Sequence, residues 1–339
     1  MKRPTGHLSR PRWCANTIAS ACFIIVLTAI VEAANAAGPE PYPSRPIHLI
    51  VPFTAGNQLD VFARVIGSRL EESIGQPVIV ENRPGVSGNV ASEVVAKAPP
   101  DGYTLLVSGV LITLLPLTYG SRAVDPVASF APITRLAQQP IVIAVNASLN
   151  VNSLSGLIAL ARRNPGKIAY ATSGIGTAQH LAMTILSQRA GVEFLHIPYV
   201  NSGQLIGDVL AGEVPIAMSF PGTVEPHLRT GRLKALAVTS PHRALAWPDI
   251  PTVAESGFPG FDVLSWVGVL APAGTPLEII DRLHREIVRI LDMPEVRNVF
   301  LAQSAEPVGN TPEEFAAEIR SSIARWAPVV SAAGIRPDN

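Results

Sequence analysis

The sequence contains very little cysteine. Its 339 residues include two, Cys14 and Cys22, and both lie near the N-terminus. If the first 36 residues are removed during export, the mature chain has no cysteine at all. Disulfide bonds, thiolate metal sites and cysteine nucleophiles are then excluded. A chain of about 300 residues can instead bury enough apolar surface to fold without disulfides.

Long hydrophobic runs and an excess of one charge are also absent from most of the chain. One apolar run, residues 15–31, is about 17 residues long, at the short limit for a membrane span. The chain carries 26 basic and 26 acidic residues. Without its first 36 residues, which hold four bases and one acid, its net charge is near −3. Nucleic acid is therefore not an expected partner, because binding phosphates requires a basic face.

The single apolar run has the flanks of a secretory signal peptide. Four basic residues and no acid precede it, and small residues follow it at 33–37. Ala34-Asn35-Ala36 fits a cleavage motif. A lipoprotein is excluded because the apolar run continues past Cys22. A membrane anchor is the alternative, but the small residues at the exit favour cleavage. The sequence therefore predicts a signal peptide over residues 1–36, cleaved near Ala36.

Short β-rich runs alternate with helical patterns along the mature chain. The apolar run 47–51 is typical of a buried parallel strand. Residues 59–74 carry apolar side chains on one helical face, and Gly75 follows as a helix stop. Further strands are predicted at 78–80, 103–107, 141–145, 168–172, 216–218 and 235–239, and further helices at 154–163, 178–190 and 203–211. The alternation predicts an α/β fold with largely parallel sheets, and the number of units favours two lobes.

Two late helices have strong start signals. Thr275-Pro276-Leu277-Glu278 and Thr311-Pro312-Glu313-Glu314 both match a capping box with proline at the first helical position. These signals are structural, and no active-site role is needed to explain them.

Conventional catalytic and cofactor motifs are missing. The sequence has no G-x-S-x-G elbow, no phosphate-binding loop with G-K-S/T and no H-E-x-x-H. Gly174 and Gly176 follow a strand and open a helix, as in dinucleotide-binding proteins, but Gln179 occupies the place of the third glycine. We therefore predict no catalytic residue, no cofactor and no metal site.

Two strand-to-helix loops, residues 52–60 and 172–180, are the candidate binding elements. Each follows a buried strand, and ligands of open α/β folds bind at the carboxyl ends of strands. Each also precedes a helix N-terminus, whose free N–H groups and positive dipole end attract an anion without a charged side chain. Gly56, Gly174 and Gly176 allow the backbone to approach a ligand closely. Ordinary connecting turns have a similar composition, so the pattern alone leaves that alternative open.

His180 and Asp60 each allow two interpretations. His180 with Ser173 or Thr177 would make a secreted hydrolase, although a histidine one turn into a helix more often supports the preceding loop. Asp60 fits a first-turn acid that compensates the helix dipole better than half of a catalytic carboxylate pair.

A succession of short motifs runs through nearly the whole mature chain. Examples are Tyr42-Pro43-Ser44-Arg45-Pro46-Ile47, Glu81-Asn82-Arg83-Pro84-Gly85, Ala98-Pro99-Pro100-Asp101-Gly102-Tyr103, His196-Ile197-Pro198-Tyr199, Pro251-Thr252-Val253-Ala254-Glu255 and Ala271-Pro272-Ala273-Gly274-Thr275-Pro276. In this order they resemble the periplasmic receptors of tripartite tricarboxylate transporters, also called Bug-type receptors.

The resemblance implies a two-lobed Venus-flytrap fold, each lobe a mostly parallel sheet flanked by helices. Lobe 1 would comprise residues 38–139 plus 264–339, and lobe 2 residues 140–263. The protein would be a periplasmic monomer that captures a small carboxylate (a di- or tricarboxylate or an aromatic acid) and delivers it to a membrane permease. A receptor that presents its ligand to a membrane sensor is the other implied role.

In the family the two loops hold the ligand carboxylate through backbone amides and hydroxyls. Carried onto this chain, the ligand-binding residues are Phe53, Thr54, Ala55, Gly56, Asn57, Gln58, Asp60, Ser173, Gly174, Gly176, Thr177 and His180.

Departures from the family pattern bear on the ligand. Asn57 replaces a second glycine, and Ser219, also a predicted site residue, replaces an acid that pairs with the ligand ammonium in amino-acid receptors. Loss of that charge-assisted hydrogen bond favours a carboxylate without an amino group. Segment 109–115 is unusually apolar, and Val110, Leu111 and Ile112 are predicted either to contact an apolar part of the ligand or to pack within the lobe.

Overall fold

The computed structural model describes residues 42–199, 201–244 and 247–332 of the chain. The predicted signal peptide, its cleavage motif and both cysteines lie outside these residues. From Arg45 onward the chain forms one compact unit, to which the following description applies. Within the described ranges, no helix has both the length and the apolar character that a membrane crossing requires.

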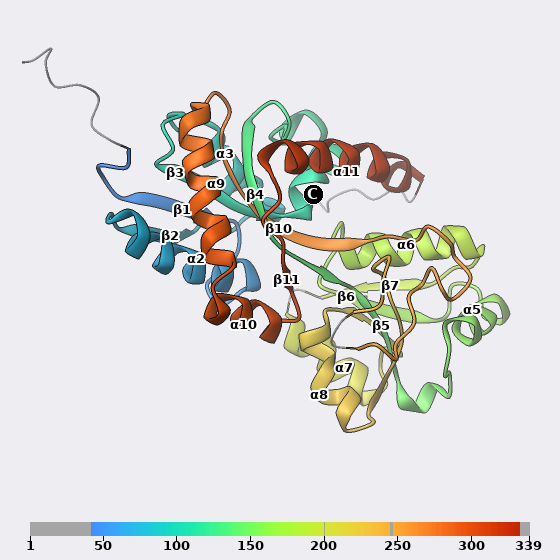
Figure 1. The fold of residues 1–339 in the computed structure, drawn as a ribbon. Helices are drawn as coiled ribbons and strands as arrows, with labels where there is room; N and C mark the ends of the chain where they lie inside the picture. The colour runs from blue at the N-terminus through green and yellow to red at the C-terminus, as the bar shows by residue number, and fades with distance from the viewer. Residues whose placement is uncertain (1–41, 200, 245–246, 333–339) are drawn as a thin grey trace, which may run out of the picture. The chain divides into compact units, whose positions relative to one another are not determined.

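The first of two sheets has six strands in the order β11-β4-β10-β3-β1-β2 (Figure 1). β1 pairs in parallel with β2 and β3, whereas β10 is antiparallel to β3 and β4, and β11 is antiparallel to β4. The strands are β1 Ile47–Val51, β2 Val78–Asn82, β3 Thr104–Gly109, β4 Phe130–Pro140, β10 Leu264–Pro272 and β11 Glu306–Pro307.

The second sheet has five strands in the order β7-β6-β8-β5-β9. β6 is parallel to β7 and β8, and β5 is antiparallel to β8 and β9. The strands are β5 Val142–Asn146, β6 Ala169–Thr172, β7 Leu195–Pro198, β8 Ile216–Ser219 and β9 Leu233–Val238. β5 is buried along its whole length, as its apolar sequence predicts.

Helices flank both sheets, and α2 and α9 pack against each other beside the first one (Figure 1). The described helices are α2 Gln58–Ile74, α3 Asn89–Ala96, α4 Leu115–Tyr119, α5 Leu154–Arg163, α6 Ala178–Ala190, α7 Ser202–Ala211, α8 Pro221–Arg229, α9 Leu277–Leu291, α10 Pro294–Ala302 and α11 Pro312–Ala332. The predicted α/β class is therefore confirmed.

The sheets are mixed, and the prediction of mostly parallel sheets is wrong. In the first sheet β10 and β11 run against the other strands, and in the second sheet β5 does. The sequence pattern did not indicate β4 and β10. β4 contains Pro132 and ends in Gln138-Gln139-Pro140, and proline normally argues against a strand within a sheet. The first sheet draws its strands from residues 47–140 and 264–307 and the second from 142–238. The lobe limits at 139/140 and 263/264 stay a prediction.

The two predicted capping boxes have different outcomes. At α11 the box is confirmed, because the Glu314 side chain accepts from Thr311 N–H at 3.0 Å and the Thr311 hydroxyl accepts from Glu314 N–H at 3.2 Å. At α9 it is wrong. Pro276 is the N-cap itself, so Thr275 lies one residue outside the helix and its hydroxyl donates to the Pro272 carbonyl at 2.8 Å.

Candidate functional site

One cavity of about 620 Å³ is lined by both predicted loops. The β1–α2 loop contributes Phe53, Asn57 and Gln58, and the β6–α6 loop contributes residues 173–179. An adjoining cavity of about 400 Å³ shares Asn57, Gln58 and Ser173 with the first and is also lined by Gly56 and Ser219. The structure thus brings the two helix N-termini to one place, as expected for strand ends that face a common site.

In the β1–α2 loop, a buried carboxylate holds the backbone in place. Gly56 has a left-handed backbone (φ +83°), and its N–H donates to Asp60 Oδ2 at 2.8 Å. Asp60 also accepts from Arg64 Nε at 3.0 Å and from Asn82 Nδ2 at 3.0 Å. Asn57 caps α2 by accepting from the second helical N–H at 2.9 Å. Burial alone would raise the pKa of Asp60, but these hydrogen bonds hold it below its usual range, so the side chain is a carboxylate.

In the β6–α6 loop, the buried side chain of His180 holds the backbone in place. Gly176 is again left-handed (φ +72°), and its N–H donates to His180 Nδ1 at 3.1 Å. Thr177 caps α6 by accepting from His180 N–H at 3.3 Å. The His180 ring stacks on His196 with centroids 3.9 Å apart, and His196 Nε2 lies 2.7 Å from Thr172 Oγ1. Burial lowers the pKa of His180 to about 3, with a further contribution from His196, and lowers the pKa of His196 to about 4. Both rings are neutral at pH 7.

The two loops therefore share one arrangement: a left-handed glycine, an N-cap residue, and an acceptor at the third helical position that binds the glycine N–H. This arrangement places Asp60 and His180 behind the loops, and neither is among the residues that line the two cavities. Thr54 and Ala55 are exposed and do not line them either. Four first-turn amides have no acceptor within the described residues and stay available to a ligand: Gln58, Asp60, Ala178 and Gln179.

A reciprocal amide pair fixes one lining side chain. Gln58 Nε2 donates to Gln139 Oε1 at 3.0 Å, and Gln139 Nε2 donates back to Gln58 Oε1 at 2.7 Å. Gln139 is buried on β4. The pair joins the start of α2 to the end of β4, so Gln58 is held beside both cavities.

Much of the remaining lining was not predicted. Val110 and Leu111 line the larger cavity as one alternative predicted, whereas Ile112 is 1% exposed and packs in the core. The lining residues that sequence reasoning missed include Ser87, Leu114, Leu115, Thr118, Tyr119, Tyr199, Phe220, Ser265 and Trp266. Tyr199 lies in a quoted motif, and Trp266 lies in the unpredicted strand β10. Among the residues that the structure describes, no Asp, Glu, Lys, Arg or His lines either cavity.

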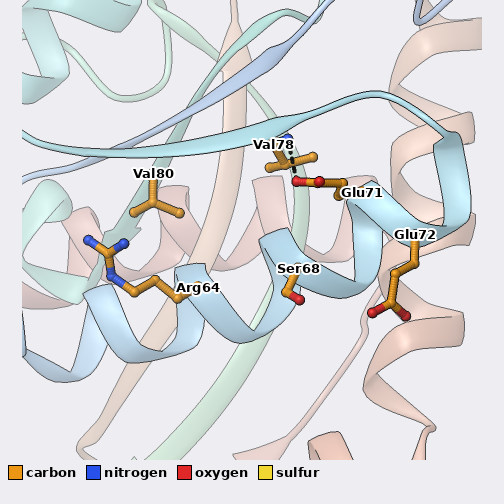
Figure 2. Close-up of a pocket in the computed structure, with 6 residues that line it drawn as sticks. All are labelled: Arg64, Ser68, Glu71, Glu72, Val78 and Val80. Carbon is orange, nitrogen blue, oxygen red and sulfur yellow. Dashed lines mark hydrogen bonds between the residues drawn. The ribbon is translucent and has the colours of Figure 1, made fainter.

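A separate surface hollow of about 330 Å³ lies between α2 and β2. Figure 2 shows Arg64, Ser68 and Glu72 along α2, with Val78 and Val80 on the strand beside it. Glu71 already accepts from the Val78 N–H at 3.2 Å. The hollow involves no helix N-terminus, and in the part of the chain that is described no group of three His, Cys, Asp or Glu could hold a metal ion. The loop cavities are therefore the candidate binding site.

Acidification should destabilise the protein through the stacked histidines. An unfolded histidine takes up a proton near pH 6.5, whereas folded His180 and His196 do so only near about 3 and 4. Below about pH 6.5 the unfolded chain therefore binds more protons, so each histidine costs up to about 1.4 kcal/mol per pH unit until the folded pKa is reached. The free energy of unfolding measured in urea should be about 2–3 kcal/mol lower at about pH 5.5 than at about pH 7.

Two histidine variants test this pH dependence, one at a largely buried histidine and one at an exposed histidine. His196→Gln should roughly halve the difference between the two pH values, because one buried titrating group is removed. Exposed His242→Gln should leave it unchanged. Equal stability of the wild-type protein at both pH values would contradict the buried neutral pair.

Comparison with known proteins identifies the family. A family model described as the tripartite tricarboxylate transporter family receptor matches residues 62–335. The chain is 36% identical to Protein BugT of Bordetella pertussis strain Tohama I over 322 residues, covering 93% of this chain and 98% of BugT.

Two solved structures share both sequence and fold with the chain. R. palustris Rpa4515 with adipate is 35% identical, with a TM-score of 0.77, over 87% of this chain and 100% of that one. The periplasmic binding protein BugD is 33% identical, with a TM-score of 0.74, over the same shares.

The fold and these matches define a two-lobed solute-binding protein, a receptor rather than an enzyme. The chain belongs to the tripartite tricarboxylate transporter receptor family, and the resemblance noted in its sequence motifs is confirmed.

Proposed function

We propose that this receptor works in the periplasm, where it captures a small organic carboxylate (a di- or tricarboxylate or an aromatic acid) and delivers it to the permease of a tripartite tricarboxylate transporter. The observation that carries the proposal is the meeting of two capped helix N-termini in one cavity without charged side chains. Such N-termini bind anions through free N–H groups and the helix dipole. The ligand carboxylate would lie against the amides of Gln58 and Ala178, with Ser173 and Asn57 adding polar contacts.

The uncharged lining supports a carboxylate without an amino group. A ligand ammonium buried here would need an acidic partner, and an unpaired buried charge is strongly disfavoured. Ser219 lines the smaller cavity at the position where amino-acid receptors of the family carry an acid, and no acid among the described residues lines either cavity. The related structure of Rpa4515 with adipate, a carboxylate, agrees with this ligand class.

A hydrolase built on His180 lacks support in the geometry. The Nδ1 lone pair already accepts the Gly176 N–H, and burial keeps the pKa of the ring at about 3. The Thr177 hydroxyl donates to the Gly174 carbonyl at 2.8 Å rather than to the ring. A base with so low a pKa does not activate a hydroxyl near neutral pH. His180 thus supports the loop.

A thermal-shift screen tests the proposed ligand class. Mono-, di- and tricarboxylates, amino acids and sugars should be compared at equal concentrations, because a ligand that binds only the folded state raises Tm with concentration. We expect at least one organic acid to raise Tm. Shifts with sugars or cations, and none with any acid, would overturn the carboxylate assignment.

The proposal also covers the export of the chain and its partner in the membrane. We infer that residues 1–36 direct the chain to the periplasm, with cleavage near Ala36, and that the mature receptor acts as a monomer. N-terminal sequencing of the exported protein tests the cleavage. Capture from membranes with and without ligand distinguishes the permease from a membrane sensor, the other partner that a ligand-loaded receptor would serve.

A further inference from the structure

The larger cavity has an extensive apolar wall. The segment after β3 forms a 3-10 turn, Val110–Thr113, followed directly by α4. From it Val110, Leu111, Leu114 and Leu115 all line the cavity. Trp266 and Phe220 add aromatic surface from β10 and the start of α8. Such a wall gains free energy when an apolar part of a ligand replaces water.

Four of the hydroxyls that line the larger cavity are engaged within the protein. The Thr118 hydroxyl donates to the Leu114 carbonyl at 3.0 Å, and the Tyr199 hydroxyl donates to Asp208 at 2.9 Å. Ser87 and Tyr119 bind each other through their hydroxyls at 3.2 Å, which uses one of their two protons. A carboxylate needs donors, and these hydroxyls chiefly offer acceptor lone pairs to the cavity.

A third helix N-terminus near the site offers little more. α8 begins beside the smaller cavity, but its first residue, Pro221, has no N–H, and Thr223 N–H is bound to the Phe220 carbonyl at 3.1 Å. Of the first three residues of this helix, only Gly222 therefore has a backbone N–H left for a ligand. The two loop N-termini are therefore the anion-binding part of the site, and no Lys, Arg or His in the described part of the chain lines either cavity to pair with another carboxylate.

We infer that the preferred ligand carries one carboxylate on an apolar, uncharged body, such as a hydrocarbon chain or an aromatic ring, with the carboxylate on the two loops and the body against Val110, Leu111 and Leu115. This inference rests on the proposed carboxylate function and narrows it to one part of the predicted ligand range. A second carboxylate or an ammonium group on that body would lose its hydration without gaining a charged partner among the lining residues.

Three six-carbon acids of matched length test the inference by calorimetric titration of the wild-type protein. Hexanoate has one carboxylate, adipate has a second at the far end, and norleucine adds an ammonium group. We expect hexanoate to bind at least about 10-fold more tightly than adipate or norleucine, because only it buries no unpaired charge. 3-Phenylpropanoate should bind at least as well as hexanoate.

The outcomes distinguish this inference from the proposed function. If adipate binds as tightly as hexanoate or more tightly, or if malate or citrate binds and neither apolar acid does, the apolar ligand class is wrong and the carboxylate receptor stands. If no carboxylate in the broader screen binds, the proposed function itself is wrong, and the inference falls with it.

A charge placed on the apolar wall provides a second test. Leu111 is partly exposed and lines the cavity, so Leu111→Lys introduces an ammonium group there. We expect this variant to bind adipate at least about 10-fold more tightly than the wild type and hexanoate at least about 10-fold more weakly. The matched control is Leu277→Lys, at a leucine that is 78% exposed on α9 and lines neither cavity.

For the control variant, both affinities should equal those of the wild type. Unchanged selectivity in Leu111→Lys would contradict a ligand body on this wall. If that variant does not fold, the comparison of the three acids on the wild-type protein still decides the inference.

Discussion

Replacing Gly268 with alanine should destabilise the folded protein by about 3 kcal/mol, at the upper end of the range for overpacked cores. Gly268 lies in the middle of β10, between β3 and β4. A Cβ atom added there would lie 2.6 Å from Phe315 Cε1 and 3.0 Å from the Thr134 carbonyl oxygen. Phe315 is fully buried and packs edge-on against Trp266 with centroids 5.1 Å apart. Neither the strand nor the ring can yield without disturbing its neighbours.

A glycine with free space around it provides the control for Gly268→Ala. Gly207 lies within α7, and an added Cβ there meets nothing within 4 Å. Gly207→Ala should therefore be neutral or stabilise by up to about 1 kcal/mol, because alanine is the better helix former. Urea unfolding measures both variants. A loss below about 1 kcal/mol for Gly268→Ala would show that the core accommodates the methyl group.

A double variant identifies the clash as the cause. Phe315→Leu removes the ring atoms that the new methyl would meet, at its own cost as a core truncation. Gly268→Ala combined with Phe315→Leu should lose less stability than the sum of the two single variants. Additive losses would place the cost at the Thr134 carbonyl instead. Because Trp266 lines the cavity, Gly268→Ala should also weaken ligand binding.

The same strand shows why part of the fold was not predictable. β10 reads Leu-Ser-Trp-Val-Gly-Val-Leu-Ala-Pro, and a glycine inside a strand weakens the pattern that identifies it. The register of β10 on β4 shifts between Val267 and Gly268, so even its pairing is irregular. In contrast, α5 and α6 begin and end at the predicted residues, because Ser153 and Thr177 cap them and Gly191 ends α6. Local signals predict helices well, whereas antiparallel pairing between residues about 130 apart depends on tertiary packing.

The candidate site also has parts that the sequence predicts and parts that it does not. Loops after buried strands were predictable, since strand ends and helix starts both have local signals. A supporting role for His180 was one of its two interpretations, but the choice depends on hydrogen bonds that the sequence does not show: the N–H groups of Gly56 and Gly176, both with positive φ, donate to Asp60 and His180. The apolar wall was only half predictable. Leu111 faces the cavity and Ile112 the core, although the two are neighbours of similar hydrophobicity.

Replacing Asp60 with alanine should destabilise the protein by about 3 kcal/mol and weaken ligand binding at least about 100-fold. The carboxylate is 2% exposed and accepts hydrogen bonds from Gly56 N–H, Arg64 and Asn82. Its removal takes the acceptor away from three partly exposed donors, and hydrogen bonds to a charged group contribute about 1.5–3 kcal/mol each. The freed Gly56 would no longer hold the loop against the start of α2, so the Gln58 amide would lose its orientation toward the ligand.

Two further variants test whether the loss in Asp60→Ala comes from the hydrogen bonds at this position or from the removal of any acidic side chain. Asp60→Asn keeps one oxygen for Gly56 N–H and should recover part of the stability and of the ligand-induced rise in Tm. Asp281→Ala, at an exposed position of α9, should change stability by no more than about 0.5 kcal/mol and leave binding intact. Denaturant unfolding without ligand and Tm shifts with the best acid of the screen measure the two effects separately. If Asp60→Ala bound that acid as tightly as the wild type does, the β1–α2 loop could not be the element that holds the carboxylate, and the site would have to rest on the β6–α6 loop alone.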